Sequence, residues 1–139
     1  MKALIKAVRS DLLGDGVVNA LCTGGIHTGR APDTAAMPYL VLSRLGSFRP
    51  DYYTSDHQVE TVTMRFQTWS WSAETAISTT ERIEKLFRTT WPSLDDGTVI
   101  FVAKESDGLE LDPDPDDSGN DVWQGIIDMT FLVQRDPTA

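Results

Sequence analysis

The chain has 139 residues, 21 of them acidic and 12 basic, and this length predicts a single domain over residues 1–139 that buries its own core. No apolar run approaches the ~20 residues of a membrane span, and Lys6 and Arg9 interrupt the apolar start of the chain, so the sequence predicts neither a membrane segment nor a signal peptide. Eight of the acids lie between Glu105 and Asp121 without a basic residue, which leaves the rest nearly neutral and without a basic patch for gripping nucleic acid.

The first predicted element is a helix over residues 3–13, ended by Gly14 and Gly16. Residues 17–21 form either another helical turn or an extended piece. Residues 24–38 have the composition of a loop, with room for a short strand at Ile26 and His27. The apolar stripe of the helix comprises Leu4, Ile5, Val8, Leu12 and Leu13.

The middle of the chain predicts two strands and a helix. Residues 39–45 are apolar on both faces, which is typical of a strand inside a sheet. From residue 58, alternation predicts a long strand whose apolar parity changes at Trp69 and Trp71, so we expect a bulge or a change of burial near Thr68. Helical spacing begins after this strand and extends over residues 73–91, with Ser72 as the N-cap and Pro92 as the stop.

The last third predicts a long antiparallel hairpin. Alternation is clearest over residues 121–135, and we expect this strand to pair with residues 98–111. An acidic loop at about 105–121 then forms the tip. The order α-β-β-α-β-β predicts an α+β fold, a small antiparallel or mixed sheet of about four main strands with two helices packed on one face.

No catalytic or cofactor-binding pattern is visible, so we expect no enzyme, no metal and no cofactor. The sequence DPDPDDSGND invites a calcium interpretation, but neither EF-hand frame fits, because Asp117 or Gly125 takes an essential position. His27 and His57 lie far from any metal-ligand pattern. Cys22 is expected to be a small buried hydrophobe or a partly exposed thiol.

Aromatic residues offer candidate contacts with other subunits or partners, since aromatic side chains are enriched at protein interfaces. The alternative is that they fold back on the core. The candidates are Phe48, Tyr52 and Tyr53 on the connection between the two central strands, together with Trp69 and Trp71.

Several segments together resemble a known family. A short N-terminal helix, ALIKAVRSDLL, precedes a glycine turn and the stretch RAP…MPYLVLSRLGS. The long strand VTMRFQTWSWSAETA then runs into the helix ISTTERIEKLF, and a final strand ends in FLV. This combination resembles the tail-completion and tail-terminator proteins of long-tailed bacteriophages and related prophages. The acidic stretch at 107–121 is the main departure from that pattern.

The resemblance implies a structural virion protein at the tail end of the head–tail junction, assembled in the host cytoplasm. It implies a homo-oligomer, a hexameric ring whose subunit can be monomeric when isolated. The ring would cap the tail tube, end its polymerisation and contact the tail tube protein and the head-completion proteins. DNA would pass through its channel without specific binding, and no membrane would be involved.

An acidic loop could rim such a channel and repel DNA phosphates, or it could be an outward, solvated loop. The candidate channel-facing residues are Asp107, Glu110, Asp112, Asp114, Asp116, Asp117 and Asp121. Three other functions stay open. They are a head–tail connector or neck component, a small metal-dependent hydrolase that uses the acidic cluster, and a small-molecule binding module with a deep apolar pocket.

Overall fold

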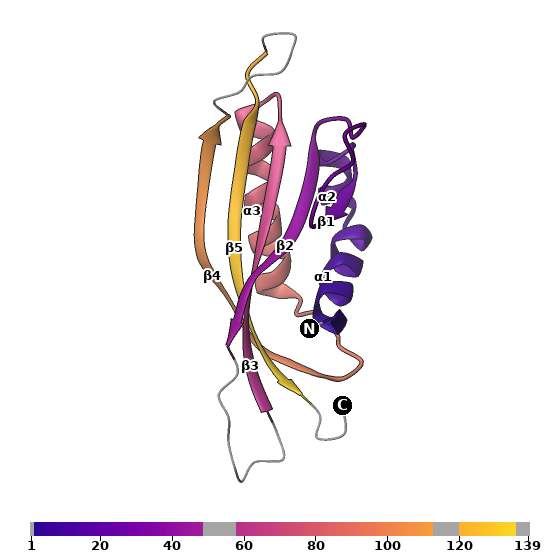
Figure 1. Cartoon of the computed structure of the whole chain (residues 1–139), viewed down its shortest axis with the longest axis vertical. Helices are drawn as coiled ribbons and strands as arrows, with labels where there is room; N and C mark the ends of the chain where they lie inside the picture. Colours follow the sequence, from indigo (N-terminus) through magenta and orange to yellow (C-terminus); the bar gives the residue numbers. More distant parts are fainter. Residues whose placement is uncertain (1, 49–57, 113–119, 136–139) are drawn as a thin grey trace.

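The computed structural model describes residues 2–48, 58–112 and 120–135, and arranges them as one five-stranded sheet with helices packed on one face (Figure 1). In chain order the elements are α1 (Lys2–Gly14), α2 (Gly16–Leu21), β1 (Ile26–Thr28), β2 (Tyr39–Phe48), β3 (Gln58–Ser70), α3 (Ala73–Thr89), β4 (Gly97–Leu111) and β5 (Trp123–Arg135).

The strand order is β1-β2-β3-β5-β4, so β3 is central and β1 and β4 form the two edges. β1 runs parallel to β2, and the other pairs are antiparallel. The mixed sheet and the helices confirm the predicted α+β class. β2 to β5 are the four main strands, β1 is the short strand for which the sequence left room, and residues 17–21 are helical.

The core lies between the sheet and the helices, because alternate residues of each strand point to the same side. The rings of Phe66 and Phe131 lie on either side of Phe87 in α3, each with its centroid 5.7 Å from that of Phe87. α1 contributes Leu4 and Val8 to the same cluster. The remaining fully buried large side chains of the core are Leu12, Leu40, Leu42, Met64, Ile83, Ile127 and Met129.

α3 lies directly against β5 at Gly125. A Cβ atom at this glycine would lie 2.8 Å from the carbonyl oxygen of Ala76 and 3.1 Å from the Thr80 methyl carbon. Because any side chain here would push the helix outward, glycine allows the close approach of α3 to the sheet. Ser72 caps the helix as expected, accepting a hydrogen bond from the Thr75 N–H at 3.4 Å.

α2 is clamped to α3 through Asp15. Its carboxylate caps α2 by accepting from the Val18 N–H at 3.1 Å, and it also accepts two hydrogen bonds from Arg82, at 2.6 and 2.9 Å. The side-chain hydrogen bond to Arg82 is the largest contribution that lowers the pKa of Asp15. A helix end and a tertiary contact therefore depend on one carboxylate.

Three details of the sequence prediction were wrong. β3 pairs with β5 without a register shift, and burial keeps its alternation through Thr68 and Ser70, so only the residue type changes there. Trp91 lies beyond the end of α3 and is exposed. Leu13 was expected in the buried stripe but is 46% exposed, since it lies on the outer side of α1.

The expected acidic loop at about 105–121 was also too long. β4 continues to Leu111, so Glu105, Asp107 and Glu110 lie on a strand. Burial explains the difference, because β4 is an edge strand whose residues beyond 103 are all exposed, and charged side chains are well tolerated on such an edge. The expected pairing of residues 98–111 with the last strand is confirmed.

We expect Phe87→Ala to lower the free energy of unfolding by about 3–5 kcal/mol, because it leaves a cavity between Phe66 and Phe131. Chemical denaturation followed by circular dichroism measures the change. Phe101→Ala is the matched control, since the Phe101 side chain is 54% exposed and its removal leaves no cavity. Equal destabilisation by both substitutions would contradict the assignment of the core.

We expect Asp15→Asn to lower the melting temperature at pH 7 by a few degrees. The pKa of Asp15 is lowered in the folded chain, so its stabilisation is fully present above the unfolded value of about 3.9 and is lost as the pH falls through the folded pKa. The difference between wild type and variant should therefore shrink below about pH 4. Asp33→Asn removes the acid of a solvent-exposed pair and should cause no shift at either pH.

Candidate interaction surfaces

The described residues contain no group of three or more His, Cys, Asp and Glu side chains that could hold a metal ion. Cys22 is buried, and burial raises the pKa of its thiol to about 11, so the thiol is protonated at neutral pH and is a poor nucleophile. No described helix is long and apolar enough to cross a membrane. The described part of the sheet presents two solvent-exposed surfaces, which are its face away from the helices and the edge strand β4.

The sheet face opposite the helices is the first of these surfaces. We call it the open face and define it by the odd-numbered residues of β3 from Val59 to Trp69 and the even-numbered residues of β5 from Gln124 to Gln134, which lie opposite one another in register. No described helix covers it (Figure 1). All these side chains except Asp128 are partly accessible to solvent, so this face can accept a partner.

A polar network occupies the centre of the open face. Arg65 donates two hydrogen bonds to Asp128, at 2.9 and 3.1 Å, and the Ser106 hydroxyl donates a third at 3.1 Å. The side-chain hydrogen bond to Asp128 raises the pKa of Arg65. The Thr130 hydroxyl donates to Glu105 at 2.8 Å, so the network links β3, β5 and β4. The Asp128 carboxylate is held by three hydrogen bonds, which makes the centre of this face rigid and polar.

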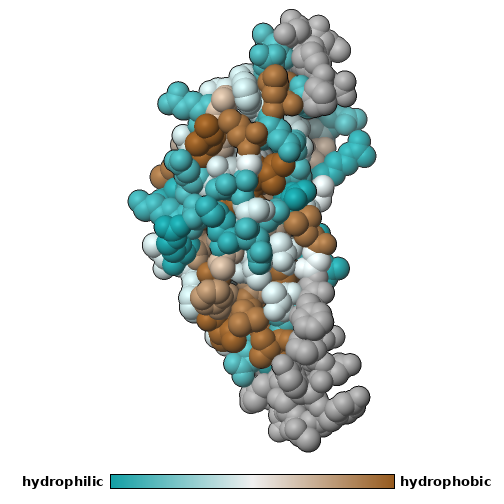
Figure 2. All heavy atoms as spheres, turned by 90° about the vertical axis from the view of Figure 1, so that its left-hand side faces the viewer, coloured by the Kyte–Doolittle hydropathy of each residue, from teal (hydrophilic) through white to brown (hydrophobic). Residues whose placement is uncertain are grey.

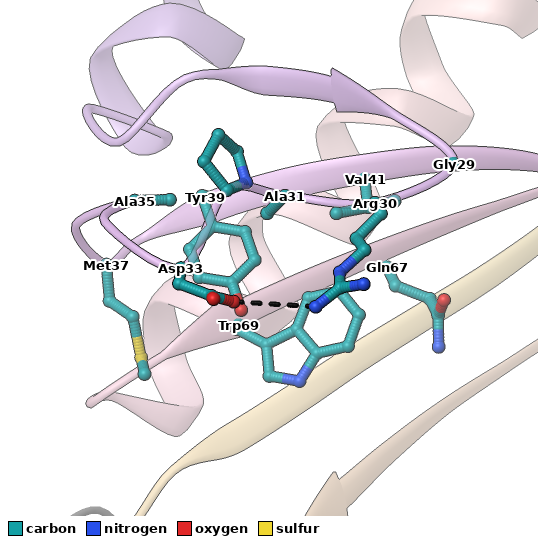
Figure 3. A pocket seen from close by; sticks show the side chains of 11 residues that line it. Gly29, Arg30, Ala31, Asp33, Ala35, Met37, Tyr39, Val41, Gln67 and Trp69 are labelled. Atoms are coloured by element: carbon teal, nitrogen blue, oxygen red, sulfur yellow. Dashed lines mark ion pairs between the residues drawn. The ribbon is translucent and has the colours of Figure 1, made fainter.

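An aromatic pair marks one end of the open face. Tyr39 and Trp69 stack with their ring centroids 5.3 Å apart, and residues 29–38 fold over β2 beside them. Figure 3 shows the side chains that line the hollow between these parts, among them the exposed Arg30–Asp33 ion pair. The hollow has a volume of about 470 Å³, and the two charged groups of the ion pair lie 3.5 Å apart. This hollow opens to solvent. It lacks the deep, enclosed apolar character that a small-molecule binding module would need.

The edge strand β4 forms a second surface. Figure 2 views this side of the molecule, where a hydrophilic band separates two groups of hydrophobic side chains. Exposed apolar residues of β4 lie toward both of its ends, and acidic residues lie between them. Lys104 contacts Asp107 at 3.0 Å and Glu84 of α3 at 3.6 Å. The exposed apolar side chains are Ile100, Phe101, Leu109 and Leu111.

The apolar edge was not among the sites predicted from the sequence. The run from Val99 to Val102 predicts a strand, but a register shift between Val99 and Phe101 leaves Phe101 opposite Leu132 on the open face. Its 54% exposed side chain has no helix over it. The apolar run itself was the available signal in the sequence. It becomes an exposed surface because β4 lies at the edge of the sheet, and the strand order is needed to know this.

The structure places some of the predicted aromatic candidates. Trp69 stacks on Tyr39 and is half-buried, while Trp71 lies just beyond β3 and is 44% exposed. Phe48 is the last residue of β2, and its side chain lies outside the described part, as do residues Tyr52 and Tyr53 altogether. Their role in contacts with other subunits or partners stays a prediction.

The acidic candidates divide between β4 and the connection from β4 to β5. Asp107 and Glu110 are exposed on β4, Asp112 comes directly after β4, and Asp121 is exposed just before β5. The other candidates, Asp114, Asp116 and Asp117, lie outside the described residues. β4 and β5 place the described acids at one end of the hairpin; their orientation toward a channel stays a prediction.

Comparison with protein families finds a match to the family described as tail completion protein gp17, over residues 6–134. Two solved structures share the fold across almost the whole chain. One is a chain of the virion of a native gene transfer agent particle, with a TM-score of 0.70 and 14% identity over 95% of this chain and 96% of that one. The other is the gp17 protein of bacteriophage SPP1, with a TM-score of 0.57 and 17% identity over 94% of this chain and 88% of that one. No curated protein matches the sequence.

We expect Asp128→Ala to lower the free energy of unfolding by about 2–3 kcal/mol, because it leaves the Arg65 guanidinium and the Ser106 hydroxyl without their acceptor. Urea denaturation measures the change. Asp33→Ala breaks the exposed ion pair to Arg30 and serves as the control with no measurable effect. If Asp128→Ala were as neutral as Asp33→Ala, the network could not be what organises the open face.

Proposed function

The chain belongs to the tail completion protein gp17 family and is a structural component of the virion tail, and from this premise we propose that it caps the tail tube as a ring. The ring, which we take to be hexameric, ends tube polymerisation and joins the tail to the head-completion proteins. The observation that carries the proposal is the family match over residues 6–134, which takes in every described helix and strand in whole or in part.

The surfaces of the subunit support a ring. In a closed ring of identical subunits, each copy contacts its neighbours through two different patches. The sheet has two unlike edges, the short β1 beside α1 on one side and the long exposed β4 on the other. The open face is left over for the tail tube protein or the head-completion protein, and its rigid polar centre suits a specific contact.

The genome has to pass through such a ring. We propose that the acidic residues beyond β4, in residues 112–121, rim the channel. Repeated around a ring, their charge repels the phosphates of passing DNA, an effect that reaches about 8 Å at physiological salt. Repulsion of this kind acts on every phosphate alike, so the contact with DNA is non-specific.

The proposal is tested by adding the purified chain to polymerising tail tube protein of the same virion. Capped tubes cannot grow from that end, so the mean tube length in electron micrographs should fall as the ratio of chain to tube protein rises. Asp33→Ala, which changes only an exposed ion pair, should shorten tubes as well as the wild type does. The heat-denatured chain should have no effect.

Unchanged tube lengths, with no chain found at tube ends, would contradict the capping function. If the chain then co-purified with portal or head-completion proteins but not with tubes, the head–tail connector function would replace it.

A further inference from the structure

The outward side of α1 carries a basic stripe. Lys2, Lys6 and Arg9 are all exposed, and their spacing places them on one side of the helix, with the exposed Leu13 one turn beyond them. We call these four residues the α1 stripe. Arg9 also donates to the Ile26 carbonyl at 3.3 Å, which fixes α1 beside β1. The stripe therefore lies along the β1 edge of the sheet.

The acids near this stripe do not neutralise it. Asp11 turns inward, since one of its carboxylate oxygens is buried, and burial raises the pKa of that carboxyl. Asp95 lines the same shallow hollow as Lys6 and can offset the charge of that lysine. The other two cations of the stripe, Lys2 and Arg9, do not line this hollow. The outward side of α1 thus presents positive charge that ends in an apolar residue.

The opposite edge of the sheet carries the complementary pattern. Glu105, Asp107 and Glu110 are exposed on β4, and the exposed Leu109 and Leu111 lie at the same end of the strand. We call these five residues the β4 edge. Lys104 at its border pairs with Asp107 at 3.0 Å and with Glu84 at 3.6 Å, so it offsets one of the three acids and the edge remains net negative.

The two patterns also agree in length. Lys2 and Leu13 are about 16 Å apart along a helix that rises 1.5 Å per residue. Glu105 and Leu111 are about 20 Å apart along a strand at 3.3 Å per residue. On α1 the apolar Leu13 follows the three cations, and on β4 the apolar Leu109 and Leu111 flank Glu110 at the end of the strand. Charge and apolar contact can therefore be matched at the same time.

We propose that the β4 edge of one copy docks on the α1 stripe of a second copy, with acids against Lys6 and Arg9 and with Leu109 and Leu111 against Leu13. This inference rests on the proposed ring and identifies its subunit contact. It assigns Asp107 and Glu110 to that contact and leaves the acids of residues 112–121 to the channel rim. An exposed strand edge is commonly protected by covering it with a helix, and here the helix comes from the neighbour. Because the two patterns lie on opposite edges of one chain, the contact repeats from copy to copy and can close a ring (Figure 1).

The test reverses the charges on each edge in turn. Variant A carries Asp107→Lys with Glu110→Lys, and variant B carries Lys2→Glu with Lys6→Glu, which keeps the Arg9 hydrogen bond to the Ile26 carbonyl. In variant A both edges are basic, and in variant B both are acidic, so each alone should associate at least about tenfold more weakly than the wild type. Sedimentation velocity at low salt over a range of concentrations measures this, and wild-type association should weaken as sodium chloride is added.

The decisive sample is an equimolar mixture of variants A and B. Every contact between the two variants is complementary again, so the mixture should recover the wild-type assembly with A and B alternating. The control combines Asp33→Lys with Glu74→Lys, which changes the net charge as much as variant A at exposed positions outside the α1 stripe and the β4 edge. It should assemble as the wild type does. Circular dichroism confirms that every variant is folded.

The outcomes separate this contact from the proposed function. If A and B each assemble like the wild type, the β4–α1 contact is wrong while the ring stands. If each is impaired but the mixture does not recover, both edges take part in assembly without contacting one another, and the β4–α1 contact is wrong. If the wild type forms no oligomer in solution, the same samples are tested for binding to tube ends, and absence of several copies there would overturn the ring together with the contact.

Discussion

The structure depends on the uninterrupted pairing of β3 with β5, from Gln58 opposite Arg135 to Ser70 opposite Trp123. Because a single register holds for the full length of both strands, every side chain is assigned to one of two faces. One face becomes the core under α3, where Gly125 lets the helix approach closely. The other becomes the open face with the Arg65–Asp128 pair at its centre. Because β3 pairs with one side of β5, β4 pairs with its other side. β4 is therefore the outermost strand of the sheet on that side.

Much of this arrangement could be predicted from the sequence. The alternation from Val62 to Phe66 and the helical spacing after Ser72 are local patterns, and local periodicity reports which side of an element is buried. The cap at Ser72 and the long final hairpin are indicated by the same kind of signal, and all are confirmed. The family resemblance also rested on these segments.

Strand order and neighbouring elements decide the features that the sequence could not predict. Phe101 resembles a core residue, but the sheet ends beside it and it stays exposed. Thr68 and Ser70 resemble surface residues, but α3 covers their face. The acids on β4 suggested a loop because charge is rare inside a sheet, whereas an exposed edge accepts it readily. In each case the position of the residue in the sheet and the elements packed on it decide whether the residue is buried, and its residue type alone does not.

The candidate surfaces combine into one picture of an assembling subunit. In the proposed ring, the three contact faces are a rigid polar face, an acidic strand edge and a basic helix at the opposite edge. In this proposal the faces bind other proteins, and the buried, protonated Cys22 takes no part. This matches a structural component of a tail, where specificity comes from complementary surfaces.

The most direct test of the central claim is the number of copies of this chain at the end of a tail tube. Cryo-electron microscopy of tubes assembled with the purified chain would determine it. We predict a closed, rotationally symmetric ring of about six copies around an open channel. A single copy, or copies scattered along the tube wall without ring symmetry, would contradict it.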